Sequence, residues 1–351
     1  MNKKNKNNWK KSILSPSSTI KEAFSNLEET GMQIIFVCEE NNKLLGTITD
    51  GDIRRGLLKG MGLADEILKI TNKDPIVISS DIDPNTAEKI MNVNKIKSLP
   101  VVNKVGQLID LYSINSLELK SYNNYDIVIM AGGMGKRLLP ITKDMPKAMV
   151  KLDGEPMIQI IIKKFIKFGF VNFYISVNYL KEKIINYLKS GKKLGVQINY
   201  IKEKKPLGTI GSLSLLNRIS KNFLVINCDV FTNLNFLELI KFHEQSKSAL
   251  TIAANIIEQY NNFGEIKTDG TRVLSFIEKP VEKKYNNAGI YVFNKSVLKY
   301  VKKNQSLDIN TFVNFLLNKN LKISVFPIYE NWTDVGIKSE LKKIKRELKD
   351  A

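Results

Sequence analysis

Short apolar runs alternate with amphipathic segments over the second two thirds of the chain. Longer segments with helical spacing lie at residues 157–169, 180–191, 210–219 and 236–246, and runs of strand length at 126–130, 171–177, 196–201, 222–227 and 249–256. This alternation predicts an α/β domain with a mixed, mostly parallel, doubly wound sheet. The later segment 263–279 reads as a hairpin, which would be an antiparallel addition to that sheet.

The first third of the chain contains an internal repeat. Residues 33–46 align without a gap with residues 97–110, an offset of 110 − 46 = 64 positions, so that Val37 corresponds to Val101. Each copy reads as helix, strand, polar turn, strand and helix. Because a unit of this size cannot bury its own apolar face, we predict that the two copies pack together.

This repeat resembles a tandem pair of cystathionine β-synthase (CBS) domains, and the segment GTITDGDIRRGLL that begins at Gly46 supports the resemblance. In that family a Thr or Ser, and an Asp three residues later, often hold the ribose and phosphate of an adenine nucleotide. Thr49 and Asp52 match these positions, whereas the second copy has Ser113 and Ser116. The resemblance implies at most one intact half-site, and the alternative is a degenerate pair kept for dimerisation.

A polar segment at residues 117–126 interrupts the pattern and is the predicted linker. We therefore predict two domains, with the CBS pair at residues 1–120 and the α/β domain at residues 124–351. The CBS pair is expected to be regulatory or to form a dimer.

A glycine loop, MAGGMGKRL, starts at Met130 directly after the first apolar run of the α/β domain. Glycine lets backbone N–H groups approach phosphate oxygens, and open α/β sheets bind ligands at the carboxyl ends of their strands. A Walker loop is excluded because Met130 occupies its first glycine position and Arg137 follows Lys136 where Ser or Thr is required. A dinucleotide fingerprint is excluded because Leu138 replaces its third glycine.

The loop resembles that of the sugar-1-phosphate nucleotidyltransferases, G-G-x-G-[ST]-R-L-x-P-x-T followed by P-K. The matching residues are Gly132, Gly133, Gly135, Arg137, Leu138, Pro140, Thr142, Pro146 and Lys147. Lys136 departs from the pattern and adds charge near the triphosphate. The resemblance implies a Rossmann-like nucleotidyltransferase domain in which Arg137 braces the leaving pyrophosphate and Lys147 bridges the sugar phosphate and the α-phosphate. It also implies that the nucleotide is bound by Ala131, Gly132, Gly133, Gly135 and Lys136.

Later segments agree with the same family in order and spacing. KEKKPLGTIGSL resembles the segment that lies against base and triphosphate, which implies nucleotide contacts for Glu203, Gly208 and Thr209. VINCD and NWTDVG supply Asp229 and Asp334, which match the two metal-binding aspartates of the family. The implied sugar contacts are Gly264, Glu278, Lys279, Asn287 and Gly289.

This chemistry does not require the residue types that are scarce in the chain. A sugar 1-phosphate is already ionised near neutral pH, so it needs no general base, and the single histidine, His243, is expected to be a surface or packing residue. In-line attack on an α-phosphate needs alignment and neutralisation of charge. Mg²⁺, the expected cofactor, usually takes one or two carboxylates plus phosphates, which Asp229 and Asp334 would supply.

The sequence is less explicit about the substrates. Glu203 could accept the adjacent N–H donors of guanine, which favours GTP. A CBS pair joined to this transferase domain resembles the glucosamine-1-phosphate guanylyltransferases of bacterial legionaminic acid pathways. The alternatives are a mannose-1-phosphate guanylyltransferase, a hexose-1-phosphate transferase that uses UTP or dTTP, and a nucleotide sensor without catalytic activity.

Composition adds a few further expectations. The net charge is +19, but the lysines are scattered, so we expect solvated surfaces and phosphate ligands rather than nucleic acid or membrane as partners. No apolar run reaches the ~20 residues of a membrane helix, and no secretory signal is visible. Cys38 and Cys228 lie in apolar runs and are expected to be buried free thiols. We therefore expect a cytoplasmic protein, and a homodimer or higher homo-oligomer.

Overall fold

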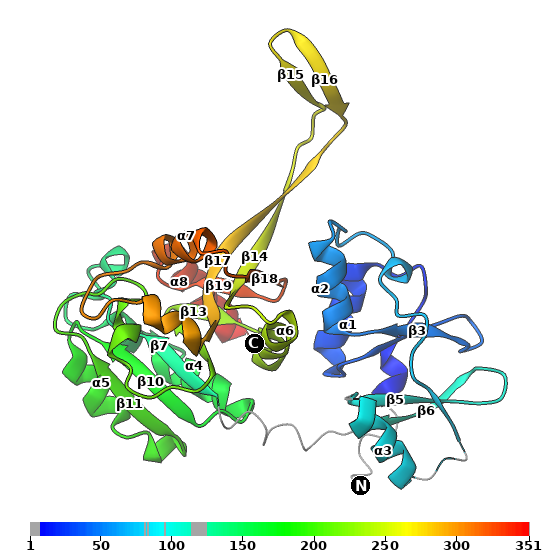
Figure 1. Ribbon diagram of the computed structural model, residues 1–351, viewed down its shortest axis with the longest axis horizontal. Helices are drawn as coiled ribbons and strands as arrows, with labels where there is room; N and C mark the ends of the chain where they lie inside the picture. The colour runs from blue at the N-terminus through cyan, green and yellow to red at the C-terminus, as the bar shows by residue number, and fades with distance from the viewer. Residues whose placement is uncertain (1–7, 81, 83, 95, 114–124, 351) are drawn as a thin grey trace. The chain divides into compact units, whose positions relative to one another are not determined.

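The computed structural model describes residues 8–80, 82, 84–94, 96–113 and 125–350. The chain forms two compact units, Met1–Glu118 and Leu119–Ala351 (Figure 1). The predicted boundary between 120 and 124, most of the predicted linker and Ser116 lie outside the described residues.

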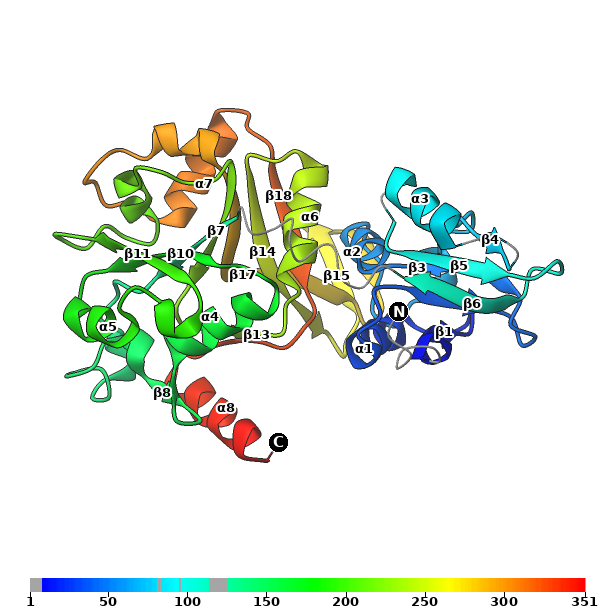
Figure 2. The same ribbon diagram turned by 90° about the horizontal axis from the view of Figure 1, so that it is seen from below.

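The first unit is built from two copies of one arrangement, as the repeat predicted (Figure 2). Its elements are η2 (Asn8–Ser12), β1 (Ile13–Leu14), α1 (Ile20–Thr30), β2 (Ile35–Cys38), β3 (Leu44–Ile48), α2 (Asp50–Leu58), η3 (Ile67–Lys69), β4 (Ile78–Ser79), α3 (Pro84–Asn94), β5 (Ser98–Val102) and β6 (Leu108–Ser113). β2 pairs in parallel with β1 and antiparallel with β3, and β5 pairs in the same way with β4 and β6. α1 and α3 are offset by 84 − 20 = 64 residues, which is the offset of the sequence repeat.

Quasi-symmetric hydrogen bonds join the two copies. Leu44 N donates to Gly106 O (3.0 Å), and Leu108 N donates to Asn42 O (2.9 Å). The residues of the second bond are the counterparts of the first, because 108 − 44 and 106 − 42 both equal 64. Leu108 also lies in the apolar core of the first copy, against Phe36. A strand of the second copy therefore completes the core of the first.

The second unit is an α/β domain around a seven-stranded sheet. Its elements are β7 (Asp126–Met130), η5 (Lys136–Leu138), η6 (Lys147–Met149), β8 (Lys151–Leu152), β9 (Glu155–Pro156), α4 (Met157–Lys167), β10 (Asn172–Val177), α5 (Lys181–Leu188), η7 (Lys192–Leu194), β11 (Gln197–Lys202), η8 (Gly211–Leu215), β12 (Asn222–Asn227), β13 (Val230–Thr232), α6 (Phe236–Ser246), β14 (Leu250–Tyr260), β15 (Glu265–Asp269), β16 (Arg272–Ile277), β17 (Val281–Asn294), η9 (Lys295–Tyr300), α7 (Ile309–Asn318), β18 (Ile323–Ile328), β19 (Trp332–Asp334) and α8 (Lys338–Asp350). The strand order is β11-β10-β7-β12-β17-β14-β18. The first four strands are parallel, and only β17 runs against its neighbours, so the prediction of a mixed, mostly parallel sheet is confirmed.

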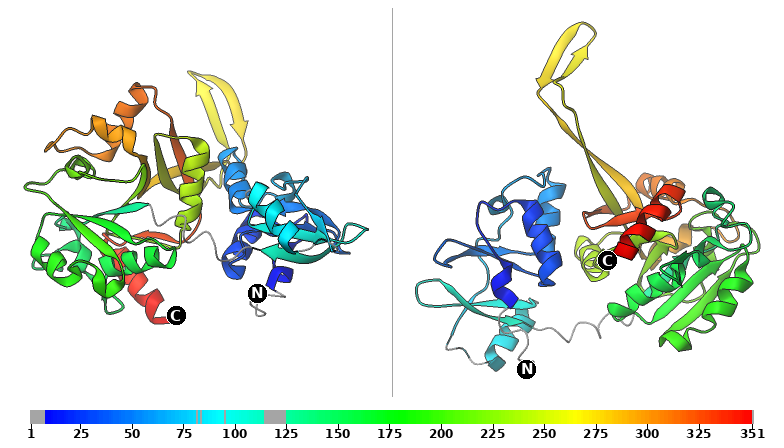
Figure 3. Two further views of the ribbon diagram at one scale, coloured as in Figure 1. Left: turned by 60° about the horizontal axis from the view of Figure 1, so that its bottom comes forward. Right: turned by 180° about the vertical axis from the view of Figure 1, so that it is seen from behind.

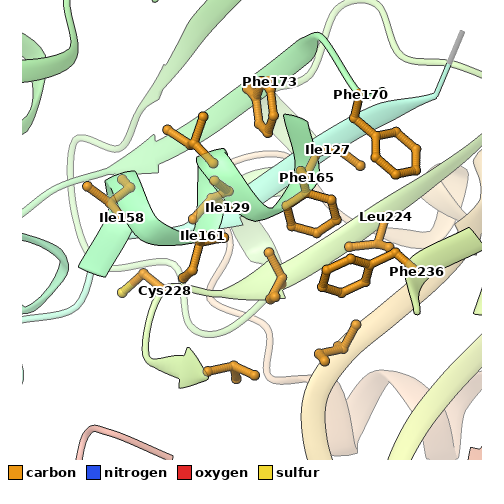
Figure 4. Packing of buried hydrophobic residues seen from close by; sticks show 14 of the residues in the cluster. Ile127, Ile129, Ile158, Ile161, Phe165, Phe170, Phe173, Leu224, Cys228 and Phe236 are labelled. Atoms are coloured by element: carbon orange, nitrogen blue, oxygen red, sulfur yellow. The ribbon is translucent and has the colours of Figure 1, made fainter. Parts of the chain in front are cut away.

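Helices cover both faces of this sheet because successive side chains of each strand point to opposite faces. In β7, Ile127 and Ile129 join one apolar core, whereas Val128 joins the other. Phe165 of α4 and Phe236 of α6 stack in the first core, with ring centroids 4.1 Å apart (Figure 4). The second unit therefore has an apolar core on each face of its sheet, and β7 lies within the sheet between β10 and β12.

One predicted helix is wrong. Residues 210–219 contain only the short 3₁₀ turn η8. Ile210 N donates to Leu307 O (3.1 Å), and a Cβ on Gly211 would lie 2.5 Å from Gln305 O. The segment is held against the loop before α7, and these tertiary contacts override its helical pattern.

The predicted hairpin at 263–279 is present as β15 and β16. β14 pairs with β18 only as far as Asn255, opposite Ile328, and beyond that point it pairs with β17 alone. Residues 256–285, called the arm here, thus leave the sheet as a two-stranded ribbon that carries the β15–β16 hairpin (Figures 1 and 3).

Candidate functional site

The glycine loop leaves the carboxyl end of β7, where the neighbouring strands β10 and β12 lie on opposite sides. Such a switch point is the usual ligand position in open α/β sheets. Ala131 N donates to Ser176 O (2.9 Å), which ties the start of the loop to β10. A Cβ built on Gly133 meets no heavy atom within 4 Å. The loop is therefore fixed at its base and open at its middle.

Gly135 cannot be replaced easily, because its backbone is left-handed (φ 70°) and a Cβ there would lie 2.9 Å from the Cβ of Lys147. The buried Thr142 donates its hydroxyl proton to Gly135 O (2.8 Å). Lys136 and Arg137 follow Gly135 in η5 and are exposed. Close packing at Gly135 thus brings the loop and Lys147 together.

Two cations and two carboxylates gather beside this loop. Lys147 forms an ion pair with Asp229, and Arg137 Nη2 lies 3.3 Å from Asp334 Oδ2. A Cβ built on Gly336 would lie 2.7 Å from an oxygen of each aspartate. Glycine is required there because any side chain would intrude between the two carboxylates.

Strand pairing places the two aspartates side by side. Asp229 directly precedes β13, Asp334 ends β19, and the antiparallel pair β13–β19 aligns Val230 with Asp334. Val335 N donates to Asp229 O (2.9 Å). Val335 also packs with Leu138 and with α8 in a small apolar core, which anchors the neighbours of Asp334 and Arg137.

The electrostatics of this pair are asymmetric. Burial raises the pKa of Asp229, and the nearby Asp334 raises it further, against the opposing effect of Lys147. For Asp334, burial acts to raise the pKa, but the hydrogen bonds to Asp229 and Gly336 N and the positive charges of Lys147 and Arg137 outweigh it, so its pKa is lowered. The site therefore concentrates negative charge at a place that needs cations to balance it.

Among the described residues, no group of three or more His, Cys, Asp or Glu side chains gathers as in an all-protein metal site. Mg²⁺ does not require one, because it commonly binds to one or two carboxylates and completes its octahedron with substrate phosphates and water. The paired oxygens of Asp229 and Asp334, next to an open glycine loop, are a donor set of this type.

Glu203 lies beneath the glycine loop and is only 6% exposed. Its Oε1 accepts from Ser176 Oγ (2.6 Å), and its Oε2 accepts from Leu207 N (3.0 Å). A Cβ on Gly132 would lie 2.8 Å from Glu203 Oε1. The structure therefore gives this carboxylate a bracing contact that the sequence did not reveal, between the glycine loop and the segment around Leu207.

Gly208 and Thr209 contact the loop before α7. Thr209 Oγ1 accepts from Ile309 N (2.7 Å), and Thr209 N donates to Asp308 Oδ1 (3.1 Å). A Cβ on Gly208, where φ is 74°, would lie 2.8 Å from the same Asp308 oxygen. Thr209 thus caps a helix that is about a hundred residues away in sequence, a contact with no signal in the local pattern.

The residues expected to contact the sugar fall into two groups. Asn287 and Gly289 lie in β17, where Asn287 Oδ1 accepts from Gly289 N (3.1 Å) and Asn287 Nδ2 donates to Tyr291 OH (2.8 Å). A Cβ on Gly289 would lie 2.7 Å from Asn227 Nδ2, two residues before Asp229. The sequence did not predict that Asn227 and Tyr291 contact these residues, although Asn227 ends the strand that leads to Asp229.

The second group, Gly264, Glu278 and Lys279, lies on the arm. Gly264 packs against the hairpin itself, since a Cβ there would lie 2.5 Å from Phe276 Cζ and 3.0 Å from Glu278 Oε2. In the described part of the chain, the ion pairs of Asp229 and Asp334 are formed with Lys147 and Arg137 and not with this group.

In the first unit, Thr49 and Asp52 bond to each other. Asp52 Oδ2 accepts from Thr49 N (2.8 Å) and Thr49 Oγ1 (2.6 Å), and Asp52 Oδ1 lies 2.6 Å from Arg55 Nη2. The pair thus forms a capping box at the start of α2. The segment 114–122, which corresponds to α2 in the second copy, lies outside the described residues.

Three further expectations can be compared with the structure. Cys38 and Cys228 are buried free thiols, as predicted. His243 is a packing residue, 2% exposed, whose Nδ1 lies 2.8 Å from Thr251 Oγ1. Within the described part of the chain, no helix is long and apolar enough to cross a membrane.

Both units match known protein families. The nucleotidyl transferase family matches residues 126–351, and the CBS domain matches residues 11–59 and 65–117. A mannose-1-phosphate guanyltransferase of Debaryomyces hansenii is 34% identical over 220 residues, and one of Yarrowia lipolytica is 35% identical over 219 residues. Each alignment covers 60% of this chain and 60% of the relative, so the chain spans less than two thirds of these relatives.

The structure of HddC from Yersinia pseudotuberculosis is similar to the second unit, with a TM-score of 0.52 and 25% identity. That alignment covers 64% of this chain and 99% of HddC. With its glycine loop, its aspartate pair and a family match over residues 126–351, the chain belongs to the nucleotidyl transferase family and carries a pair of CBS domains before the transferase domain.

Proposed function

We propose that this protein transfers a nucleotidyl group from a nucleoside triphosphate, in the first place GTP, to a hexose 1-phosphate. An oxygen of the sugar phosphate attacks the α-phosphorus, and the bond to pyrophosphate breaks as the new P–O bond forms. The observation that carries this proposal is the cluster of Arg137, Lys147, Asp229 and Asp334 beside the open glycine loop.

Each side chain of the cluster has a distinct part in this reaction. Arg137 presents a planar fork of donors that suits the leaving pyrophosphate. Lys147 places a positive charge at the centre of the site, where it can bridge the sugar phosphate and the α-phosphate. The backbone N–H groups of the glycine loop and Lys136 bind the triphosphate, and Gly208 and Thr209 line the base side of the nucleotide.

Asp229 and Asp334 would hold Mg²⁺. When bound, the metal neutralises charge on the phosphates of the transition state. In the structure, Lys147 and Arg137 form ion pairs with the two carboxylates.

The choice of GTP rests on the relatives that are named guanyltransferases. Glu203 supports guanine less directly than the sequence suggested, because each of its oxygens already accepts a hydrogen bond within the protein. The same relatives favour mannose 1-phosphate as the acceptor. Glucosamine 1-phosphate is the second candidate, since the combination of a CBS pair with the transferase domain resembles enzymes for that sugar.

We propose that Asn287 and Gly289, with Gly264, Glu278 and Lys279 of the arm, contact the sugar. The CBS pair is proposed to regulate the enzyme, with an adenine nucleotide at Thr49 and Asp52, and the protein is expected to act in the cytoplasm. Nucleotide binding in the first unit would require the Thr49–Asp52 contacts to open, because the two side chains satisfy each other in this structure.

A matrix of GTP, UTP, dTTP and ATP against mannose, glucosamine and glucose 1-phosphates tests the proposal. We expect Mg²⁺-dependent pyrophosphate release to be fastest with GTP and mannose 1-phosphate. Release with GTP and glucosamine 1-phosphate would select the second acceptor, and a preference for UTP or dTTP would contradict the choice of base. If no pair releases pyrophosphate while nucleotides still bind, the protein is a sensor instead of an enzyme.

A further inference from the structure

The arm is an unsupported part of the second unit. Its ribbon continues β14 and β17 beyond the last pair with β18, and its hairpin is a separate two-stranded sheet, β15–β16. Figures 1 and 3 show the ribbon and hairpin extending away from the seven-stranded sheet. In the described residues no third strand pairs with the hairpin.

The arm nevertheless exposes many apolar side chains. Ile266 and Phe276 face each other across the hairpin and are 53% and 61% exposed. The other large apolar residues of the arm that are more than 40% exposed are Ile257, Phe263, Val273, Leu274, Ile277, Val281 and Tyr285. A concentration of this kind on a soluble protein usually marks an interaction surface.

The low stability of an isolated hairpin also indicates that the arm binds a partner. A two-stranded hairpin is marginally stable in water unless a third strand or another layer covers one face. The outer edges of β15 and β16 also leave backbone N–H and C=O groups without a strand partner among the residues that the structure describes. A second layer or strand would bury the apolar side chains and pair such an edge.

The net charge of the arm indicates what kind of partner it binds. Residues 256–285 carry five acidic side chains (Glu258, Glu265, Asp269, Glu278 and Glu282) and five basic ones (Lys267, Arg272, Lys279, Lys283 and Lys284), so their net charge is zero in a chain of +19. A neutral segment gives no advantage to a polyanion or an anionic membrane. It is instead a surface on which two copies of a basic chain can meet without opposing like charges.

We propose that the arm is a self-association surface, on which the arm of a second copy docks. The 30 residues of the arm (285 − 256 + 1) match the 20–30 residues that a partner contributes to an interface of standard size. A two-fold axis would bring the same apolar face from both copies together, which closes the assembly as a dimer. The dimer buries Ile266 and Phe276.

Sedimentation velocity of the full chain tests this proposal. We expect the wild type to be a dimer and the double variant Ile266→Ser/Phe276→Ser to be a monomer with unchanged circular dichroism, because neither side chain belongs to an apolar core cluster of the unit. Leu317→Ser is the matched control, since Leu317 is 50% exposed on α7, and it should remain a dimer. A monomeric wild type, or a double variant that stays dimeric, would overturn the proposal.

A cross-link locates the contact and does not depend on the double variant. Val273→Cys introduces an exposed thiol near the tip of the arm, while the native Cys38 and Cys228 are buried. Under mild oxidation we expect Val273→Cys to form a disulfide-linked dimer and Leu317→Cys to remain uncrosslinked. If the arm docks on another part of its own chain, or on a different surface of the second copy, Val273→Cys will not cross-link and arm-to-arm docking is wrong.

Discussion

Lys147 and Asp229 form an ion pair although 82 residues separate them, and their side chains are only 12% and 11% exposed. One residue belongs to the segment after the glycine loop and the other follows the central strand β12. An ion pair this buried stabilises the protein only while both members are present, because a single buried charge is costly. Replacing either residue should therefore change both the proposed catalysis and the stability of the fold.

Replacement of Lys147 should show this coupling. In Lys147→Met, Asp229 and Asp334 lose a balancing cation, so we expect a lower melting temperature without metal and a larger stabilisation by Mg²⁺ than in the wild type. Turnover should fall by about a hundredfold or more. Thermal denaturation with and without Mg²⁺ measures the first effect and pyrophosphate release the second.

Lys163→Met is the control for this change, because the ion pair of Lys163 with Glu155 is exposed and should contribute little. If Mg²⁺ stabilises Lys147→Met no more than Lys163→Met, the metal does not bind where Lys147 acts.

Asp334→Asn should leave the fold intact and remove most of the activity. Asn keeps the size of the side chain and an oxygen that can accept from Gly336 N, which Asp334 Oδ1 now does at 2.8 Å. It removes the charge that would face the metal, so turnover should fall by about two to three orders of magnitude. Near-normal Mg²⁺-dependent turnover would rule out the two-aspartate metal site, and circular dichroism would show whether the fold is retained.

Glu203→Gln distinguishes bracing from recognition of the base. Gln offers one acceptor where Glu offers two, so it keeps the bond from Leu207 N only if its amide N–H turns towards Ser176 Oγ, which must then accept instead of donate. Two bonds to a charged group become neutral ones, at a cost of about 1 kcal/mol. If Glu203 acts as a brace, KM should rise for every triphosphate, and the ratio of kcat/KM for GTP and UTP should stay constant. A selective loss of GTP would show instead that the carboxylate contacts guanine.

The first unit should be dispensable for the reaction. A protein that begins at Tyr122 retains every contact of the aspartate cluster, so we expect measurable activity without any response to adenine nucleotides. Calorimetry on the full chain should show adenine nucleotide binding that Asp52→Ala abolishes. A wild type that binds no adenine nucleotide would refute the regulatory role, and a well-folded but inactive truncated protein would refute the separation of the two functions.

His243 should make the second unit sensitive to mild acid. Burial lowers the pKa of His243 from 6.5 to about 4, so below pH 6.5 the unfolded chain binds a proton that the folded chain does not. Stability is therefore fully present above pH 6.5 and declines as the pH falls towards 4, by about 2 kcal/mol at pH 5. Urea denaturation at pH 7.5 and pH 5 should show a smaller difference for His243→Gln than for the wild type. Equal differences would contradict this assignment.

Local patterns in the sequence predicted where most elements lie and which motifs they carry. The alternation of apolar residues located β7, β10, β11, β12, α4, α5 and α6, and the offset of 64 identified the repeated unit. The glycine loop could be identified from the sequence because its pattern of glycines, Arg137 and Lys147 lies within a few consecutive residues. The left-handed backbone of Gly135 was seen only in the structure.

The contacts between distant segments depend on how the whole chain packs. The family resemblance implied that Asp229 and Asp334 share a metal, but the pairing of β13 with β19 that makes them neighbours across 334 − 229 = 105 residues is not visible in any local pattern. The contacts of residues 305–307 replaced the predicted helix after Gly208 with a short turn, and the hydrogen bonds of Glu203 were equally invisible. Local periodicity records which face of an element is buried, but the partner on that face depends on the order of strands in the sheet, which is settled when the whole chain packs.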